Sequence, residues 1–259
     1  MSSYWQDRYT QGQAALTAKS ERQIDKQMRK YYANAAKSVI EEFENTYNRL
    51  LLALDDGLEP TPADLYKLEK YWEMVGKLRQ TLNRLGEVEI EMLTKQFQQS
   101  YFSIYNGLHL PVDAKFSTMP EETVKQLISS VWCADGKTWS NRVWDNTGKL
   151  ADMLNDELIN TLLTGKDTAE LRDNLQRVFN VSYREAKRLV NTELAHIQTV
   201  AAEQRYKDAG IEYAEVWADE DERRCDICGK LHQKKYKIGT EMPIPAHPNC
   251  RCCIVPVIN

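Results

Sequence analysis

The chain ends in two short clusters of thiols, Cys225-Asp226-Ile227-Cys228 and His247-Pro248-Asn249-Cys250-Arg251-Cys252-Cys253. Five of the six cysteines lie in this stretch, and a histidine stands beside the second cluster. A C-x-x-C turn lets two thiolates approach one ion from adjacent backbone positions, and the His247-x-x-Cys250 pair supplies two further corners of a tetrahedron. Zinc takes four such ligands at about 2.0–2.3 Å. The spacing therefore predicts a structural zinc site with Cys225, Cys228, His247 and Cys250 as ligands.

The fourth ligand of this site has two candidates. Cys250 and Cys252 flank Arg251, so both would face the same side of an extended strand. We favour Cys250, because it shares a turn with His247, and keep Cys252 as the alternative. Cys253 would point away from the ion and is expected to contribute to packing.

Two other interpretations of these cysteines compete with a metal site. Thiols in a reducing cell can be small buried hydrophobic groups, and Cys225 and Cys228 could form a redox pair of the thioredoxin kind. The redox interpretation is disfavoured because no β-α-β pattern precedes the motif. Disulfides are disfavoured because the sequence shows no signal peptide and little sign of an oxidising compartment.

The composition predicts a soluble globular protein with one large or two to three small domains. The 259 residues are 42% hydrophobic and 28% charged, and the mean hydropathy is -0.60. A net charge of -4 gives no overall attraction to nucleic acid or to an anionic membrane. No apolar run approaches the length that spans a bilayer, and the N-terminus lacks the layout of an export signal. We therefore expect an intracellular or particle-associated protein.

Long amphipathic helices are predicted for the first half of the chain, as a bundle or an extended arm. Residues 4–54 are predicted to form one helix, because apolar residues recur at steps of three and four from Ile24 to Leu54, and Asp55-Asp56-Gly57 ends the pattern. A second helix should begin with Thr61 as N-cap and Pro62 at its first position, and a third should cover residues 88–105. Gly86 either separates these two helices or only bends one. The aromatic residues of the stripes are expected in the core, with a binding role as the alternative. The stripe of the second helix comprises Leu65, Leu68, Tyr71, Trp72, Val75, Leu78, Leu82 and Leu85.

Capping patterns predict four further helices in the second half. They cover residues 118–131, 140–164, 168–179 and 182–209, and Gly210 follows the last of them. β-branched and aromatic residues then predict short strands at 211–217, 236–238 and 252–258. The expected fold class is α+β: mostly α, with long N-terminal helices (1–115), a helical body (116–210) and a small zinc-stapled antiparallel β module (211–259). A module of this size cannot bury a large core alone, and a metal crosslink would supply stability.

Several short motifs follow one another in the second half of the chain. They are Trp139-Ser140-Asn141-Arg142-Val143-Trp144, Leu189-Val190-Asn191-Thr192-Glu193, Tyr206-Lys207-Asp208-Ala209-Gly210, Cys225-x-x-Cys228 and His247-Pro248-Asn249-Cys250-Arg251-Cys252. In this order they resemble the Mu F-like phage minor head (head morphogenesis) proteins, over roughly Phe116 to Val257. Asn191 departs from the pattern, because members of the family often have arginine before Thr-Glu. The departure puts a charge-dependent role of this position in doubt.

The resemblance implies a low-copy protein of the virion. Members of this family join the procapsid during assembly, associate with the portal vertex and affect packaging or delivery of the genome. The implied partners are the phage portal protein and a scaffold or major capsid protein, with no membrane. The implied location is the portal vertex of the head, after assembly in the host cytoplasm. Some relatives carry a toxin domain after the zinc segment, and we expect no such extension after Asn259.

No enzymatic activity is expected, because a zinc ion with four protein ligands has no open position for water or substrate. If Cys250 did not bind the ion and Cys252 lay too far from it, an open Cys2His site would remain, and hydrolysis would be conceivable. Deaminase-like sites place a glutamate two residues after a histidine that precedes the C-x-x-C, whereas His247 follows it. Glu193 and His196 could meet at an i, i+3 step on one helix, but no nucleophile or phosphate loop accompanies them.

A nucleic-acid-binding zinc module is the second hypothesis. Basic residues surround the expected metal site with Tyr236 interleaved: Lys230, Lys234, Lys235, Lys237 and Arg251. The acidic run Asp219-Glu220-Asp221-Glu222 opposes them, and a charge run is usually a solvated face. We expect at most weak, non-specific contact with packaged DNA, without base-specific recognition.

Overall fold

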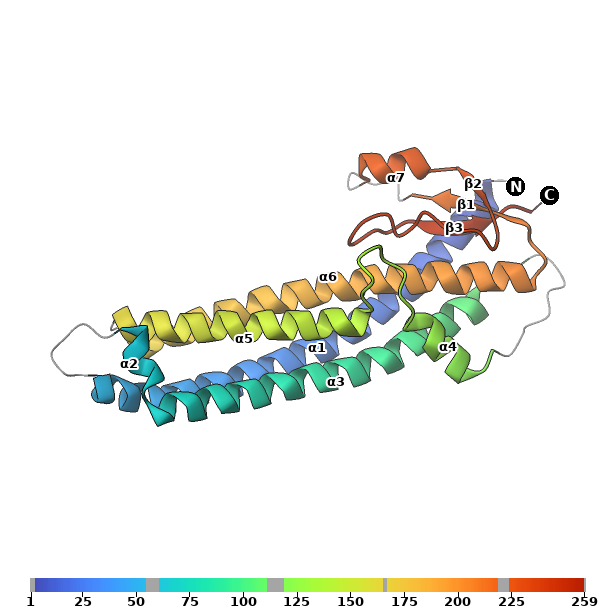
Figure 1. Ribbon diagram of the computed structural model, residues 1–259. Helices are drawn as coiled ribbons and strands as arrows, with labels where there is room; N and C mark the ends of the chain where they lie inside the picture. The colour runs from blue at the N-terminus through green and yellow to red at the C-terminus, as the bar shows by residue number, and fades with distance from the viewer. Residues whose placement is uncertain (1–2, 55–60, 111–118, 165–166, 219–223, 259) are drawn as a thin grey trace. The chain divides into compact units, whose positions relative to one another are not determined.

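The computed structural model describes residues 3–54, 61–110, 119–164, 167–218 and 224–258 (Figure 1). In this part of the chain the helices are α1 (Ser3–Leu54), α2 (Pro62–Tyr66), α3 (Glu69–Gly107), α4 (Glu121–Ile128), α5 (Trp139–Thr164), α6 (Thr168–Asp208) and α7 (Asp226–Leu231). The strands are β1 (Tyr213–Trp217), β2 (Lys235–Lys237) and β3 (Cys253–Pro256). The expected fold class is confirmed: the protein is mostly helical, with a small antiparallel sheet near a cluster of cysteines and histidine.

The chain divides into two compact units, each assembled from segments far apart in sequence. The sheet unit comprises Met1–Asp25, Met92–Trp139 and Lys187–Asn259, and the helical unit comprises Lys26–Glu91 and Ser140–Ala186. Helices α1, α3 and α6 contribute residues to both units. The expected domain ranges 1–115, 116–210 and 211–259 stay predictions.

The core of the helical unit consists of the apolar stripes that their helical spacing predicts. Large side chains of α1 that are buried in it are Met28, Tyr32, Val39, Phe43 and Tyr47. The hydroxyl of Tyr47 donates to the carbonyl of Thr161 at 3.3 Å, and that of Tyr32 donates to Glu89 at 3.1 Å. Both buried phenols are therefore satisfied, as a hydroxyl removed from water requires.

Trp72 is an exception to the expected stripe of buried residues, because 53% of its surface is exposed. Neighbouring positions on a helix point about 100° apart, and Tyr71 takes the inward direction. The indole Nε1 of Trp72 donates to the carbonyl of Tyr66 at 2.9 Å, and the ring packs against the rings of Tyr66 and Tyr71. The prediction that Trp72 lies in the core is therefore wrong.

Helix α3 covers most of both predicted helices on either side of Gly86 and is continuous through that residue. The segment after Thr61 forms only the short α2, where the Asp64 carboxylate accepts from the backbone N–H of Thr61 at 3.1 Å. A Cβ built on Gly86 would lie 2.6 Å from the ring of Trp144 on α5. The close approach of this indole, rather than a helix end, explains why the position has no side chain.

Helix α6 joins the two helices predicted for residues 168–179 and 182–209. Its predicted start is confirmed, since the Asp167 carboxylate accepts from the N–H of Glu170 at 2.8 Å. The predicted second start at Ser182 is wrong. Ser182 is buried in line with Phe179 and Ala186, and no glycine or proline interrupts the helix between them.

Gly210 ends α6 as predicted, in a Schellman motif. Its φ is +71°, a left-handed conformation that glycine adopts without strain. The N–H groups of Gly210 and Ile211 donate to the carbonyls of Lys207 and Tyr206, at 3.0 Å each. The chain thereby reverses from the long helix into β1.

The sheet has the strand order β2-β1-β3, with both pairs antiparallel. Ala214 of β1 lies opposite Tyr236 of β2 and Pro256 of β3. The carbonyl of Ile254 in β3 accepts from the hydroxyl of Tyr206 on α6 at 3.0 Å and from Nε2 of Gln13 on α1 at 2.9 Å. These buried bonds join the sheet to two helices within the sheet unit.

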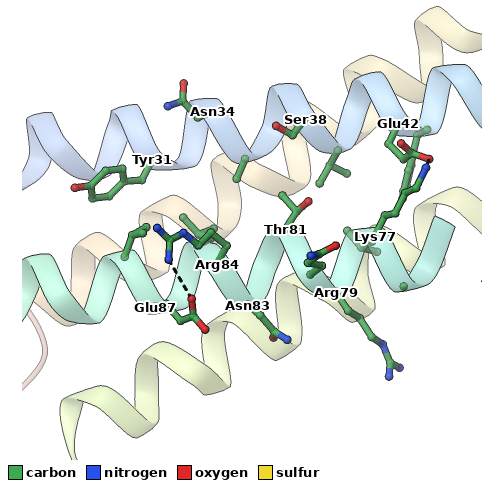
Figure 2. A pocket seen from close by; sticks show the side chains of 18 residues that line it. Tyr31, Asn34, Ser38, Glu42, Lys77, Arg79, Thr81, Asn83, Arg84 and Glu87 are labelled. Carbon is green, nitrogen blue, oxygen red and sulfur yellow. Dashed lines mark hydrogen bonds and ion pairs between the residues drawn. The ribbon is translucent and has the colours of Figure 1, made fainter. Parts of the chain in front are cut away.

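The helical unit also contains a groove of about 1200 Å³ between α1 and α3 (Figure 2). Lys77 Nζ lies 2.8 Å from a carboxylate oxygen of Glu42 across it, and Arg84 lies 3.4 Å from Glu87 along α3. Ion pairs between such exposed groups contribute little to stability. The contact between these helices therefore depends mainly on the buried stripes.

We predict opposite effects for alanine at two glycines of α3. Gly76 has nothing within 4 Å of a Cβ built on it, so Gly76→Ala should raise the free energy of unfolding by about 0.5–1 kcal/mol. Gly86→Ala carries the same entropic gain but forces a methyl group against Trp144, and should lower that free energy by about 1 kcal/mol or more. Urea denaturation measures both, and equal stabilisation by the two variants would contradict the constraint from Trp144.

Candidate metal centre

Cys225 and Cys228 are held together by the first turn of α7. Cys225 caps this helix, and its sulfur accepts from the backbone N–H of Cys228 at 3.4 Å. The carbonyl of Cys225 accepts from the N–H of Gly229 at 2.9 Å, which closes the turn. An N–H directed at sulfur favours the thiolate, so the turn both places the two sulfurs together and prepares one of them as a ligand.

His247 and Cys250 form a second turn, in the segment between β2 and β3. The N–H of Cys250 donates to the carbonyl of His247 at 3.1 Å. The Nδ1 of His247 lies 2.9 Å from the carbonyl oxygen of Pro248. A carbonyl oxygen only accepts, so Nδ1 carries the hydrogen in this contact and Nε2 keeps a free lone pair. The imidazole is thereby in the tautomer that coordinates a metal through Nε2.

The two turns converge on each other. The Nε2 of His247 lies 3.2 Å from Sγ of Cys225 and 3.0 Å from Sγ of Cys228. The Sγ atoms of Cys228 and Cys250 are 3.8 Å apart. Two sulfurs on a tetrahedral zinc ion, each at about 2.3 Å, would be about 3.8 Å from one another. The cluster could therefore bind a metal ion, and the identity of the ion as zinc stays a prediction.

Cys252 lies in the same cluster. Among the described residues the candidate ligands fall into two groups, each with its atoms within 4.8 Å of one another: Cys225, Cys228 and His247, and Cys228, Cys250 and Cys252. Cys228 belongs to both groups. Because Cys250 and Cys252 both lie close to Cys228, the choice of Cys250 as fourth ligand stays a prediction. Cys253 belongs to neither group and is buried in β3.

The close packing of these thiols opposes their joint ionisation. Burial raises the pKa of Cys228 to about 12. A hydrogen bond from the Cys252 thiol lowers the pKa of Cys250 to about 5, and the same bond raises the pKa of Cys252. Ionisation of Cys250 therefore opposes ionisation of Cys252. A divalent metal ion would supply the positive charge that allows more of the cluster to ionise.

Helix α6 contacts the second turn through Asn191 and Thr192. The Oγ1 of Thr192 accepts from the N–H of Asn249 at 3.1 Å, and Nδ2 of Asn191 donates to Oδ1 of Asn249 at 3.2 Å. Asn191 therefore supplies an uncharged hydrogen-bond donor at the position noted above as a departure from the family pattern. The sequence motif drew attention to these residues, but no local pattern reveals partners so distant along the chain.

Glu193 and His196 pack around Trp132. Glu193 is 2% exposed and accepts from Nε1 of Trp132 at 2.9 Å. The ring of His196 stacks on that of Trp132 with 4.3 Å between centroids. Burial lowers the pKa of His196 to about 4, so this imidazole is neutral at pH 7. These contacts explain both polar residues as parts of the packed interior of the sheet unit.

The basic residues noted in the sequence are all exposed: Lys230, Lys234, Lys235, Lys237 and Arg251. Lys235 and Lys237 alternate along β2, an edge strand, and so project to the same side. The acidic run Asp219-Glu220-Asp221-Glu222 lies outside the described residues. The structure thus leaves the basic side chains accessible to an anionic partner.

A cavity of about 700 Å³ lies within the sheet unit beside the cluster. Its lining includes Glu21 of α1, Trp217 of β1, Cys250 and Arg251. Burial raises the pKa of Glu21, while Lys187 and Arg251 act in the opposite direction. Charged groups of both signs therefore line the cavity. This mixture of charges does not favour one class of ligand.

Cys228 is the residue whose replacement should disturb the cluster most, because it belongs to both groups of candidate ligands. We predict that Cys228→Ser loses the metal and opens the two turns of the cluster and the adjoining sheet to hydrogen exchange while the long helices remain, because the ion would cross-link the turns. Elemental analysis of the metal and hydrogen exchange across β1 to β3 measure the two effects. Cys133→Ser is the control, because Cys133 lies outside the cluster. A metal content of one per chain in Cys228→Ser would contradict the site.

One family and one relative resemble this chain, and the family match lies in the second half. Residues 152–255 match the family described as Phage Mu protein F like protein. The NAD(+)–arginine ADP-ribosyltransferase EFV of Enterococcus faecalis (strain ATCC 700802 / V583) is 25% identical over 186 residues. That alignment covers 64% of this chain and 38% of the relative, so the chain spans well under half of that protein. No solved structure matches the chain.

The matched region contains the second half of α5, all of α6, β1, β2, most of β3 and both turns of the cluster. Among the described helices, none is long and apolar enough to cross a membrane. The family match agrees with the motifs that run from α6 to the His-Pro-Asn-Cys turn. Residues 152–255 are therefore a Phage Mu protein F-like domain, which belongs to a phage head morphogenesis family.

Proposed function

We propose that this chain is a phage minor head protein, a low-copy component of the virion at the portal vertex. It would act in head morphogenesis and in packaging or delivery of the genome. The observation that carries the proposal is the Mu F-like domain at residues 152–255, which includes both turns of the cysteine–histidine cluster. The proposed partners are the portal protein and a scaffold or major capsid protein. The proposed locations are the head and, during assembly, the host cytoplasm.

Zinc is the metal that we propose for the cluster, in a structural role. Thiolate and imidazole ligands in tetrahedral arrangement favour zinc over magnesium or calcium, which prefer oxygen. Cys250 and Cys252 both lie beside Cys228, so either thiol could be the fourth protein ligand. A filled coordination sphere leaves no position for a reactive water. This supports a non-enzymatic protein, whereas the alternative of a zinc-dependent hydrolase needs an open position.

The name of the relative from Enterococcus faecalis suggests an enzymatic alternative. That protein is named an NAD(+)–arginine ADP-ribosyltransferase, and the alignment covers 38% of its length. At 25% identity the alignment supports common ancestry of a segment and leaves most of the relative unmatched. We therefore do not extend that activity to this chain.

Exposed aromatic side chains of the helical unit suit the proposed docking on a portal or scaffold. Tyr66 and Trp72 are 47% and 53% exposed, and their ring centroids are 5.9 Å apart. Aromatic residues are enriched at protein interfaces, where a partner removes them from water.

Purified heads of the phage that encodes this chain test the proposal. Quantitative mass spectrometry should find the protein at a copy number no higher than that of the portal protein, and a portal pull-down should retain it. A Tyr66→Ala, Trp72→Ala double variant should bind the portal at least tenfold more weakly. Met153→Ala, which changes another exposed apolar side chain of the helical unit, serves as control. Absence of the protein from purified heads would overturn the proposal.

A nucleic-acid-binding zinc module remains the second candidate, favoured by the exposed lysines of β2. If Lys235 and Lys237 contact phosphates, affinity for duplex DNA should fall with salt, and a Lys235→Gln, Lys237→Gln variant should reduce the slope of log K against log salt by about 2. Lys37→Gln with Lys149→Gln, two exposed lysines of the helical unit, is the control. Absence of DNA binding at low salt would leave the head-assembly role without this addition.

A further inference from the structure

We infer that Asn191 and Thr192 of α6 form a latch on Asn249 that positions His247 and Cys250 for the metal ion. The inference rests on the proposed metal site and extends it to residues outside the cluster. It assigns a role to the Asn191-Thr192-Glu193 motif, of which only Glu193 is explained by its contact with Trp132.

The segment that supplies His247 and Cys250 needs external support. Fifteen residues separate β2 from β3, and loops of this length without secondary structure of their own have many accessible conformations. Asn249, between the two ligands, has a φ of +58°, in the left-handed region that asparagine tolerates better than most residues. A contact at Asn249 therefore acts on the backbone that carries both ligands.

The two bonds of the latch have defined directions. The hydroxyl of Thr192 donates its hydrogen to the carbonyl of Arg188 at 2.8 Å, so its oxygen is free to accept from the N–H of Asn249 at 3.1 Å. The side-chain amide of Asn191 donates to the side-chain oxygen of Asn249 at 3.2 Å. One bond holds the backbone of Asn249 and the other its side chain, which together restrict the position and rotation of this residue.

The latch couples metal binding to α6. Loss of groups that orient metal ligands typically weakens metal affinity by about 10–100-fold. Coupling between two sites is reciprocal, so zinc should in turn protect the backbone amides of α6 around Thr192 from hydrogen exchange. The stability of the part of α6 around Thr192 would thereby depend on whether the cluster has bound its metal ion.

The test is Thr192→Val, which removes the accepting hydroxyl with almost no change of volume. We expect zinc affinity, measured by competition with a chromophoric chelator, to fall at least tenfold, and zinc-dependent protection of α6 to diminish. Thr192→Ser keeps the hydroxyl and should restore both. Thr199→Val is the matched control, because Thr199 donates to the carbonyl four residues earlier on the same helix, as Thr192 does.

A second variant, Asn249→Gly, keeps the left-handed backbone and the N–H but deletes the bond to Asn191. It should weaken zinc binding by less than Thr192→Val does, and circular dichroism checks that each variant is folded. Wild-type affinity in a folded Thr192→Val protein would overturn the latch and leave the metal site intact. Failure of the wild-type protein to bind zinc would overturn the metal site itself, and the latch with it.

Discussion

The convergence of sulfur and imidazole nitrogen at the cluster is the constraint on which the C-terminal part of the structure depends. Cys228 lies 3.0 Å from Nε2 of His247 and 3.8 Å from the sulfur of Cys250, although a strand and a long loop separate α7 from the second turn. Buried thiols at these distances cannot all ionise without a cation. A metal ion would convert this opposition into attraction and would tie the two turns together.

The remainder of the sheet unit provides a rigid base for the cluster. Tyr206 and Gln13 both donate to the carbonyl of Ile254, which fixes β3 against α6 and α1. Gln198 donates to Gln13 at 3.2 Å, so the polar groups buried here form a connected network. Specific hydrogen bonds and apolar burial thus attach the sheet beside the cluster to α1 and α6.

Local patterns predicted the elements well and their boundaries less well. Helical periodicity and the Gly210 end are local properties, and both were predicted correctly. The false start at Ser182 came from a capping pattern that tertiary burial overrides. The role of Gly86 and the exposure of Trp72 depend on which neighbour occupies the inward position, which spacing alone does not specify.

The candidate site shows the same division. C-x-x-C and H-x-x-C spacing indicates residues that lie close together in the structure, because each pair lies within one turn, and their role as metal ligands stays a prediction. The contacts of Asn249 with α6, and of Glu193 with Trp132, join distant parts of the chain. Such contacts produce no periodic pattern in the sequence, so they could not be predicted from it. Both Cys250 and Cys252 lie near Cys228, so spacing did not distinguish the fourth ligand.

X-ray absorption at the zinc edge of the purified protein counts the atoms bound to the ion and identifies their elements. A structural site predicts four ligands, three sulfurs at about 2.3 Å and one nitrogen at about 2.0 Å. A coordination shell dominated by oxygen, or one that includes a bound water, would contradict a structural zinc site.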